Sequence, residues 1–189
     1  MKTFQTARRD FINKGGLIAI ALTWIVWGCG ASTQHGRETQ EVNPDAPVII
    51  DYYTAEVIRP GTAWRVYLHA KDRNGDMRDI ACVMVQRGHG TYPTSVTRLG
   101  ENHREEVRGF LFLRTPVDNN LRRDSFTLRV LVRDQQGNGS ERLELPLRFG
   151  RESQQETPEK WQEVADSSLG RMQIQLRSTF DRSRPARRR

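Results

Sequence analysis

Trp64-Arg65-Val66-Tyr67-Leu68-His69-Ala70-Lys71 is the clearest strand pattern in this chain, with apolar residues at every second position. The intervening positions hold Arg, Tyr, His and Lys. A period of two places one set of side chains inside and the other set in water, which is typical of a half-buried β-strand. The pattern predicts a strand over residues 64–71 whose Tyr67 side faces solvent.

Similar short runs, separated by turn residues, extend from residue 47 to residue 150. Residues 48–53 (VIIDYY) are β-branched and aromatic, which predicts a strand. Residues 80–85 (IACVMV) are apolar on both faces, as in a central strand. Pro146 faces outward in the last run and cannot donate a ladder hydrogen bond, so that run is predicted to be an edge strand. The other predicted strands cover residues 95–99, 107–113, 126–132 and 143–149.

About six or seven short strands with a turn roughly every ten residues predict an all-β antiparallel sandwich over residues 47–150. Arg59–Asp76 (RPGTAWRVYLHAKDRNGD) is similar to the second strand and following turn of bacterial immunoglobulin-like surface domains. Leu131–Asn138 (LVRDQQGN) resembles the last hairpin of the same group. The resemblance implies an immunoglobulin-like sandwich. It implies no particular activity, because this fold hosts adhesion, spacing and enzyme-accessory roles alike.

Residues 151–189 are predicted to form a linker, one short helix and a disordered basic tail. Thr157 and Pro158 suit the N-cap and first residue of the helix, and Gly170 suits its end. Apolar and polar residues then alternate over residues 172–176, which predicts an added edge strand. The chain ends in RSRPARRR, a composition that favours disorder.

Residues 1–28 have the organisation of an export signal. A charged head precedes an apolar run over residues 17–27, which is too short to span a bilayer by itself. Flanking glycines bring this run towards spanning length, so a retained membrane anchor is a second interpretation. Residues 29–46 are polar and contain few large apolar side chains, which predicts a flexible tether.

Arg8-Arg9-Asp10-Phe11-Ile12, followed by Lys14, resembles the twin-arginine export signal, whose characteristic positions are here Arg8, Arg9 and Phe11. Val26-Trp27-Gly28-Cys29 is similar to a bacterial lipobox, which implies lipidation of Cys29 and removal of residues 1–28. Both resemblances imply a lipoprotein held on a membrane of the cell envelope, on the periplasmic or extracellular side. A generic secretory signal with a freely secreted product is a further alternative.

The positive charge of the chain lies mostly at its two ends. The formal net charge is +7, and residues 1–28 account for +3 of it. The remaining excess of about +4 is smaller than the five arginines of the tail, Arg182, Arg184, Arg187, Arg188 and Arg189. The folded part is therefore predicted to be near neutral, which argues against a nucleic-acid-binding domain. The predicted partners are a membrane, through the lipid anchor or an N-terminal helix, and an envelope protein or glycan.

Histidines and acidic turns give no strong signal for a metal ion. The four histidines, His35, His69, His89 and His103, lack the close spacing of a zinc site. Two oxygen-rich turns, at residues 72–76 and 134–138, suit Asx turns that bond their own backbone better than a calcium loop. The sequence therefore predicts no metal and no cofactor.

Cys82 lies in the most apolar run and is interpreted as a buried small hydrophobe, because no charged neighbour lowers its pKa. With Cys29 lipidated, Cys82 has no partner for an intrachain disulfide. The leading functional hypothesis is a non-enzymatic envelope protein that presents loops or an edge strand to a partner. One alternative is an accessory subunit of an exported enzyme or redox system that uses Cys82 or a loop with His89 and His103. A passive spacer is another.

Overall fold

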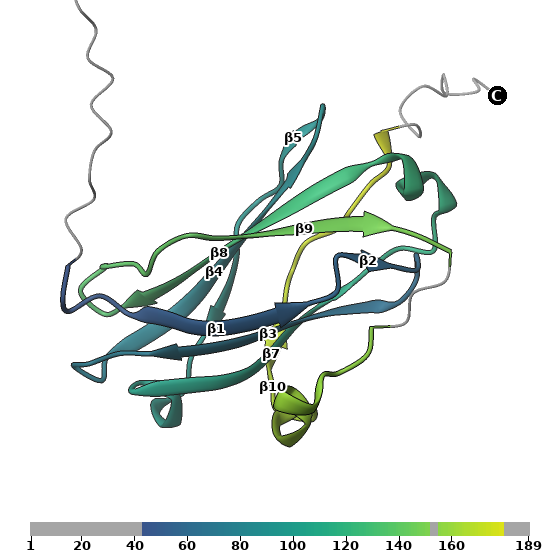
Figure 1. The fold of residues 1–189 in the computed structure, drawn as a ribbon. Helices are drawn as coiled ribbons and strands as arrows, with labels where there is room; N and C mark the ends of the chain where they lie inside the picture. The colour runs from purple at the N-terminus through teal and green to yellow at the C-terminus, as the bar shows by residue number, and fades with distance from the viewer. Residues whose placement is uncertain (1–42, 152–154, 180–189) are drawn as a thin grey trace, which may run out of the picture. The chain divides into compact units, whose positions relative to one another are not determined.

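The computed structural model describes residues 43–151 and 155–179, which form an all-β, immunoglobulin-like sandwich of two sheets (Figure 1). The four strands of the first sheet are, in spatial order, β1 (Val48–Thr54), β3 (Ala63–Lys71), β7 (Glu106–Arg114) and β10 (Ser168–Arg171). The second sheet is formed, in spatial order, by β2 (Val57–Ile58), β9 (Leu143–Phe149), β8 (Ser125–Asp134), β4 (Met77–Gln86) and β5 (Gly90–Thr91), and β6 (Ser95–Arg98) also pairs with β4.

The strand pairing is that of an immunoglobulin-like domain. β1, β3 and β7 take the places of strands A, B and E, and β4, β8 and β9 take those of C, F and G. The chain leaves the first sheet after β1, and β2 pairs in parallel with the end of β9. β10 runs parallel to β7, in the place that strand D has in constant-type domains. The predicted fold class is confirmed.

The core lies between the sheets and is built from the inward-facing half of each strand. In β3 the side chains of Trp64, Val66, Leu68 and Ala70 are fully buried, as their alternation predicts. The predicted strand over residues 80–85 is the middle of β4, which pairs with β8 on one side and with β6 on the other. Pro146 is exposed in β9, and among the described residues the outer side of β9 is paired with β2 only at Arg148 and Phe149, so the predicted edge strand holds for the part of β9 that contains Pro146 and not for its end.

The prediction that Tyr67 faces water is wrong. Tyr67 is fully buried in a second apolar cluster on the outer face of the first sheet, together with Phe110, Trp161 and Val164. Its hydroxyl lies 2.9 Å from the Thr157 hydroxyl in a hydrogen bond. The alternation in β3 separates its two faces correctly, but a segment ninety residues later in the chain covers the face that water would otherwise reach.

The predicted C-terminal helix exists as a short 3-10 helix, η3 (Glu159–Val164), and its predicted ends are wrong. The N-cap is Pro158, whose side chain has no hydrogen-bonding group, and the hydroxyl of Thr157, the predicted cap, is bonded to Tyr67 instead. Gly170 does not end the helix and lies inside β10. Two further 3-10 helices, η1 (Glu101–His103) and η2 (Asn119–Arg123), connect strands.

The segment after β10 closes one side of the sandwich (Figure 1, yellow). The hydrogen-bonded strand covers residues 168–171, not the predicted 172–176. Met172, Ile174 and Leu176 then point into the core. The Met172 amide donates to the Phe112 carbonyl of the first sheet (2.9 Å), and the Gln173 amide donates to the Ser95 hydroxyl of the second (2.8 Å). The packed core therefore includes residues well beyond residue 150.

Gly109 in β7 allows this segment to approach. A Cβ at Gly109 would lie 2.5 Å from the Ser167 carbonyl oxygen and 2.9 Å from the Leu169 side chain. Any other residue would therefore push β10 away from β7. The absence of a side chain at one position of β7 decides where the C-terminal segment enters the fold.

Candidate functional site

The residues that carry the export and lipidation predictions, Arg8, Arg9, Phe11 and Cys29, lie outside the described residues. Their roles stay predictions. Within residues 43–151 and 155–179, no helix combines the length and the apolar character that crossing a bilayer requires.

Cys82 points into the core from the middle of β4 and is 1% exposed. Burial raises the pKa of its thiol to about 12, so the thiolate is not formed near neutral pH. A reactive thiol needs access and a lowered pKa, and this side chain has neither. The interpretation of Cys82 as a small buried hydrophobe agrees with its position in the fold.

The structure does not bring His89 and His103 together. His89 lies in the turn from β4 to β5, where Gln86 pairs with Gly90. His103 lies in η1, which follows the end of β6 where Arg98 pairs with Asp79. These are opposite ends of β4, separated by seven residues of strand or roughly 20 Å. The two histidines therefore do not form one site.

A hollow of about 530 Å³ lies between the β4–β5 hairpin and the C-terminal segment, and His89 is on its rim. Tyr92 also lines this hollow, and its hydroxyl donates to Gln86 Oε1 (2.7 Å) and accepts from the Arg177 amide (3.0 Å). Those bonds hold the C-terminal segment in place, so we assign the tyrosine a structural role.

In the two oxygen-rich turns the first aspartate bonds its own backbone, as the sequence predicts, but it reaches the amide four residues on and not the amide two residues on of an Asx turn. The Asp76 amide donates to Asp72 Oδ2 (2.9 Å), and the Asn138 amide donates to Asp134 Oδ1 (2.7 Å). Asn138 Nδ2 also donates to Asp134 Oδ2 (2.7 Å), so both oxygens of the buried Asp134 are satisfied. Among the described residues, no group of three or more His, Cys, Asp or Glu side chains is placed to hold a metal ion.

Asp72 and Asp76 form a buried carboxyl pair that sequence reasoning missed. Asp72 is only 6% exposed, and its Oδ1 has no hydrogen-bond partner. Both carboxyl oxygens of Asp76 are also buried without a partner. Burial raises the pKa of Asp72 above its ordinary value of 3.8, and the facing Asp76 carboxyl adds to the increase. In the sequence, the spacing of Asp72 and Asp76 indicates only a turn. Their carboxyl groups are buried by residues that pack on this turn in the folded protein, and the spacing does not show that burial.

We expect Asp72→Asn to stabilise the protein at pH 7 by roughly 1 kcal/mol, because the amide keeps the acceptor and removes a buried charge. A raised folded-state pKa means that protonation of Asp72 stabilises the fold at low pH and that this stabilisation is lost as pH rises through the folded-state value. The gain from the substitution should therefore shrink as pH falls towards 3.8. Thermal unfolding of both proteins between pH 4 and pH 7.5 measures it.

Asp134→Asn is the matched control for that experiment. Both Asp134 oxygens accept hydrogen bonds, so an amide there loses one acceptor and should destabilise the fold. A destabilising Asp72→Asn, or a gain that does not change with pH, would contradict the assignment of an unsatisfied carboxyl pair.

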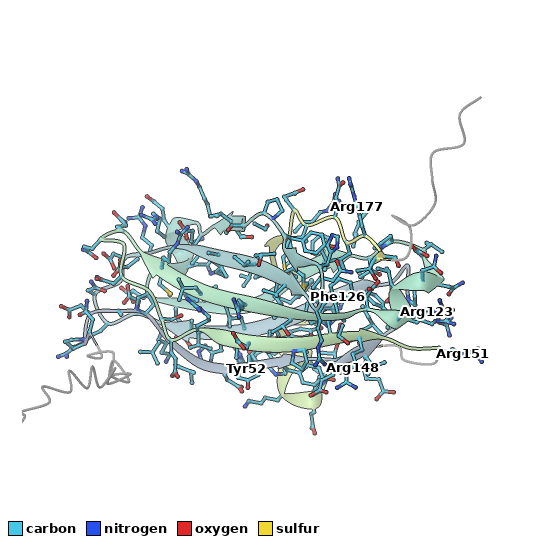
Figure 2. All side chains as sticks on the ribbon, turned by 90° about the horizontal axis from the view of Figure 1, so that it is seen from above. Tyr52, Arg123, Phe126, Arg148, Arg151 and Arg177 are labelled. Atoms are coloured by element: carbon cyan, nitrogen blue, oxygen red, sulfur yellow. The ribbon has the colours of Figure 1, made fainter. Side chains whose placement is uncertain are left out.

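The surface feature that stands out is the outer edge of β1. Among the described residues β1 pairs with β3 alone, and no described strand pairs with the backbone groups of its other edge. Three of its side chains are exposed and apolar or aromatic, with Val48 57% exposed, Ile50 51% and Tyr52 49%. Tyr52 is labelled in Figure 2. Natural proteins usually protect such an edge, because it is a template for another strand.

A groove of about 340 Å³ runs beside this edge. Its apolar wall is formed by Ile49, Ile50 and Tyr52 of β1 and by Leu143 of β9, and charged residues 141, 142 and 144 form the rim. The register of β1 against β3 shifts between Ile49 and Asp51, which brings Ile50 and Tyr52 to the same groove. The C-terminal segment closes the opposite side of the sandwich, and no described segment closes this one.

Sequence reasoning found the strand but missed the site. The run VIIDYY predicts β1, and the first position in the domain is a weak hint that it lies at an edge. The exposure of the β1 edge depends on which side of the sandwich the C-terminal segment covers. Residues 168–178 cover the side of β7 and β4, away from β1.

Comparisons with known proteins give no family for the chain and only solved structures of low similarity. No protein-family model matches the sequence, and no curated protein matches it. Among solved structures it is similar to the SrpA adhesin of Streptococcus sanguinis, with 15% identity over 57% of each chain and a TM-score of 0.38. It is also similar to the CARDB domain of a Pyrococcus furiosus protein in complex with di-metal ions, with 13% identity over 56% of this chain and 94% of that one and a TM-score of 0.33.

A third similar structure is the PKD domain of a peptidase from a Thermoplasmatales archaeon, with 14% identity over 56% of this chain and 94% of that one and a TM-score of 0.35. The chain thus covers little more than half of the adhesin structure. The immunoglobulin-like assignment of this domain follows from its own strand pairing.

Proposed function

We propose that this chain is a membrane-tethered protein of the cell envelope whose immunoglobulin-like domain binds, without catalysis, an extended segment of a partner protein along β1. The observation that carries the proposal is the unpaired edge of β1 with its three exposed apolar or aromatic side chains. In strand addition, main-chain hydrogen bonds supply affinity and alternate side chains supply specificity.

The groove beside β1 supports this choice of partner. An added strand places every second side chain towards the core side, where Ile50, Tyr52 and Leu143 offer an apolar wall. The charged rim next to that wall matches the usual arrangement of an apolar centre with a polar margin. The predicted export and lipidation signals support the tether, and the tether predicted over residues 29–46 accounts for the reach of the domain from the membrane.

Site-specific crosslinking in the native host tests the edge. A photoreactive amino acid in place of Tyr52 should crosslink one defined protein, and the crosslink should disappear when Ile50→Lys is added. A lysine on an edge strand blocks strand addition. Ile50 is half exposed, so the substitution should change the free energy of unfolding by no more than about 0.5 kcal/mol.

Val96→Lys is the matched control, because Val96 is 47% exposed on β6 of the second sheet. It should leave the crosslink intact. Equal loss in both variants, or a crosslink only to a second copy of this chain or to a glycan, would overturn the proposed partner class. The tether is tested by intact mass of the native protein: a lipid-sized addition on a chain that begins at Cys29 supports it, and an unmodified terminus contradicts it.

A further inference from the structure

One end of the sandwich gathers arginines from segments far apart in the sequence. β3 begins at this end and β7 ends there, because Ala63 pairs with Arg114. β8 begins and β9 ends at the same place, because Ser125 pairs with Arg148. Arg59 Nε donates to the Arg151 carbonyl (3.2 Å), which joins the turn after β2 to the end of β9. Figure 2 shows Arg123 and Arg151 together at this end. We call it the arginine end, defined by Arg59, Arg114, Arg122, Arg148 and Arg151.

The arginine end carries more positive than negative charge. All five of its arginines are exposed, and none of them forms an ion pair within the part of the chain that the structure describes. The acids that flank η2, Asp118 and Asp124, offset part of this charge without pairing with these arginines: Asp118 accepts from the Asn120 amide, and Asp124 is buried and accepts from Thr179. Five arginines in other places do pair with carboxylates, at 2.6–3.3 Å: Arg78, Arg104, Arg108, Arg129 and Arg133.

An exposed apolar tip lies on the same end. Val117, in the loop between β7 and η2, is 90% exposed. It projects beside the turn that contains Arg59, because a Cβ at Gly61 would lie 2.8 Å from Val117 Cγ2. Val57 of β2, which pairs with Arg148, is 41% exposed. Water-exposed valines next to unpaired arginines suit a surface that is both anionic and partly apolar.

The last described residue, Thr179, also lies at this end. The Thr179 hydroxyl donates to Asp124 Oδ1 (2.6 Å), and Asp124 directly follows η2 and Arg122. The sequence continues from Thr179 into a segment with five arginines, residues 180–189. The domain between the two charged ends of the chain is near neutral as a whole, so the arginine end is a local surplus of positive charge.

We propose that the arginine end is a docking surface for a bilayer that contains anionic phospholipid. The negative potential of such a surface attracts arginines, and an exposed apolar side chain enters the interface between lipid headgroups and acyl chains. The exposed Val117 favours a bilayer over a soluble acidic glycan, which offers no apolar layer. The proposal does not depend on the binding of a partner strand at β1, and a docked end would orient the β1 edge relative to the membrane.

Vesicle binding by residues 40–189 tests the proposal. These residues form one compact unit that contains the whole buried core of the described chain, so they are suitable as a separate protein. We expect cosedimentation with phosphatidylcholine vesicles that contain 30% phosphatidylglycerol, no binding to pure phosphatidylcholine, and weakening by salt. Each arginine at an anionic surface contributes about fivefold to the partition coefficient, so Arg122→Gln with Arg151→Gln should lower it about 25-fold.

Arg104→Gln with Arg129→Gln is the matched control, because it removes the same charge from arginines that are already paired with glutamates. It should lower binding less than threefold. Residues 40–179, without the basic tail, should bind more weakly but still prefer anionic vesicles. Ile50→Lys, which tests the β1 edge, should not weaken vesicle binding, so the two proposals fail separately.

Three results would overturn the docking surface. The first is an equal loss in the control pair, which would mean that net charge alone matters. The second is no binding by residues 40–179, which would assign all affinity to the tail. The third is an unchanged partition coefficient for Val117→Ser together with tighter binding to heparin than to vesicles, which would indicate an acidic glycan.

Discussion

A protein that ends at Gly150 is expected to lose the cooperative fold that residues 40–189 have. Residue 150 is where the strand pattern of the sequence stops, but Met172, Ile174 and Leu176 are at most 5% exposed and belong to the core. At about 1.5–3 kcal/mol for each fully buried side chain, these three contribute roughly 5–9 kcal/mol. Typical domains are stable by only about 5–15 kcal/mol.

The truncation also uncovers groups that the C-terminal residues satisfy. Tyr67 loses the packing of Trp161 against its ring, at a centroid distance of 5.5 Å, and Gln86 loses the carbonyl of Arg177 to which its side chain donates (3.1 Å). Far-UV circular dichroism and amide NMR dispersion of residues 40–150 should therefore show a largely unfolded chain at 25 °C.

Two further proteins test whether residues 151–179 are needed for the fold. Residues 40–179, which lack only the basic tail, should unfold at the same temperature as residues 40–189. The single substitution Ile174→Asp should destabilise the full-length domain strongly, because it buries a charge in an apolar site. A folded 40–150 protein that melts within a few degrees of the longer one would show that the C-terminal segment is only loosely attached.

Trp64→Ala is expected to lower the free energy of unfolding by about 3–5 kcal/mol, the usual cost of removing a large aromatic from a core. Trp64 is fully buried, and its indole Nε1 donates to the Ala55 carbonyl (2.8 Å). Ala55 lies where the chain crosses from the first sheet to the second. The side chain thus fills the core and holds the crossover. Denaturant unfolding of residues 40–189 measures the loss, with Trp161 as the remaining fluorescent probe.

Trp64→Phe separates the two roles of this side chain. It keeps most of the apolar volume and removes the donor to Ala55, so its cost should be about 1–3 kcal/mol and clearly below that of the alanine variant. Equal costs for both variants would mean that the hydrogen bond dominates. A cost for Trp64→Ala below 1 kcal/mol would contradict the placement of Trp64 in the core.

Sequence patterns predicted the strands well, because strand formation depends on residues two positions apart. The alternation around Trp64 correctly gave the inward face of β3, and the apolar run around Cys82 correctly gave a strand with neighbours on both sides. The exposed Pro146 correctly gave an edge strand. The same local patterns failed at Tyr67 and at Gly170, where the deciding neighbours lie about sixty to ninety residues away in the chain.

The candidate site was less accessible to sequence reasoning than the fold. The sequence drew attention to Cys82, His89 and His103, which the structure buries or separates. The two proposals concern the β1 edge and the arginine end. At the first, no described strand pairs with the edge, and at the second, the arginines form no ion pair with a described residue. Such absences are properties of the assembled surface and have no sequence motif.

By itself the sequence determined the all-β sandwich, the order of its strands along the chain and the position of the core faces, since these follow from side-chain periodicity and turn residues. The tertiary structure decided which side of the sandwich is open, which carboxyls are buried without partners and where the arginines meet. The physical reason is that burial and charge pairing depend on residues brought together by sheet pairing and by the C-terminal segment. A near-neutral domain can therefore hold a strongly positive end, and net charge alone does not indicate where that end lies.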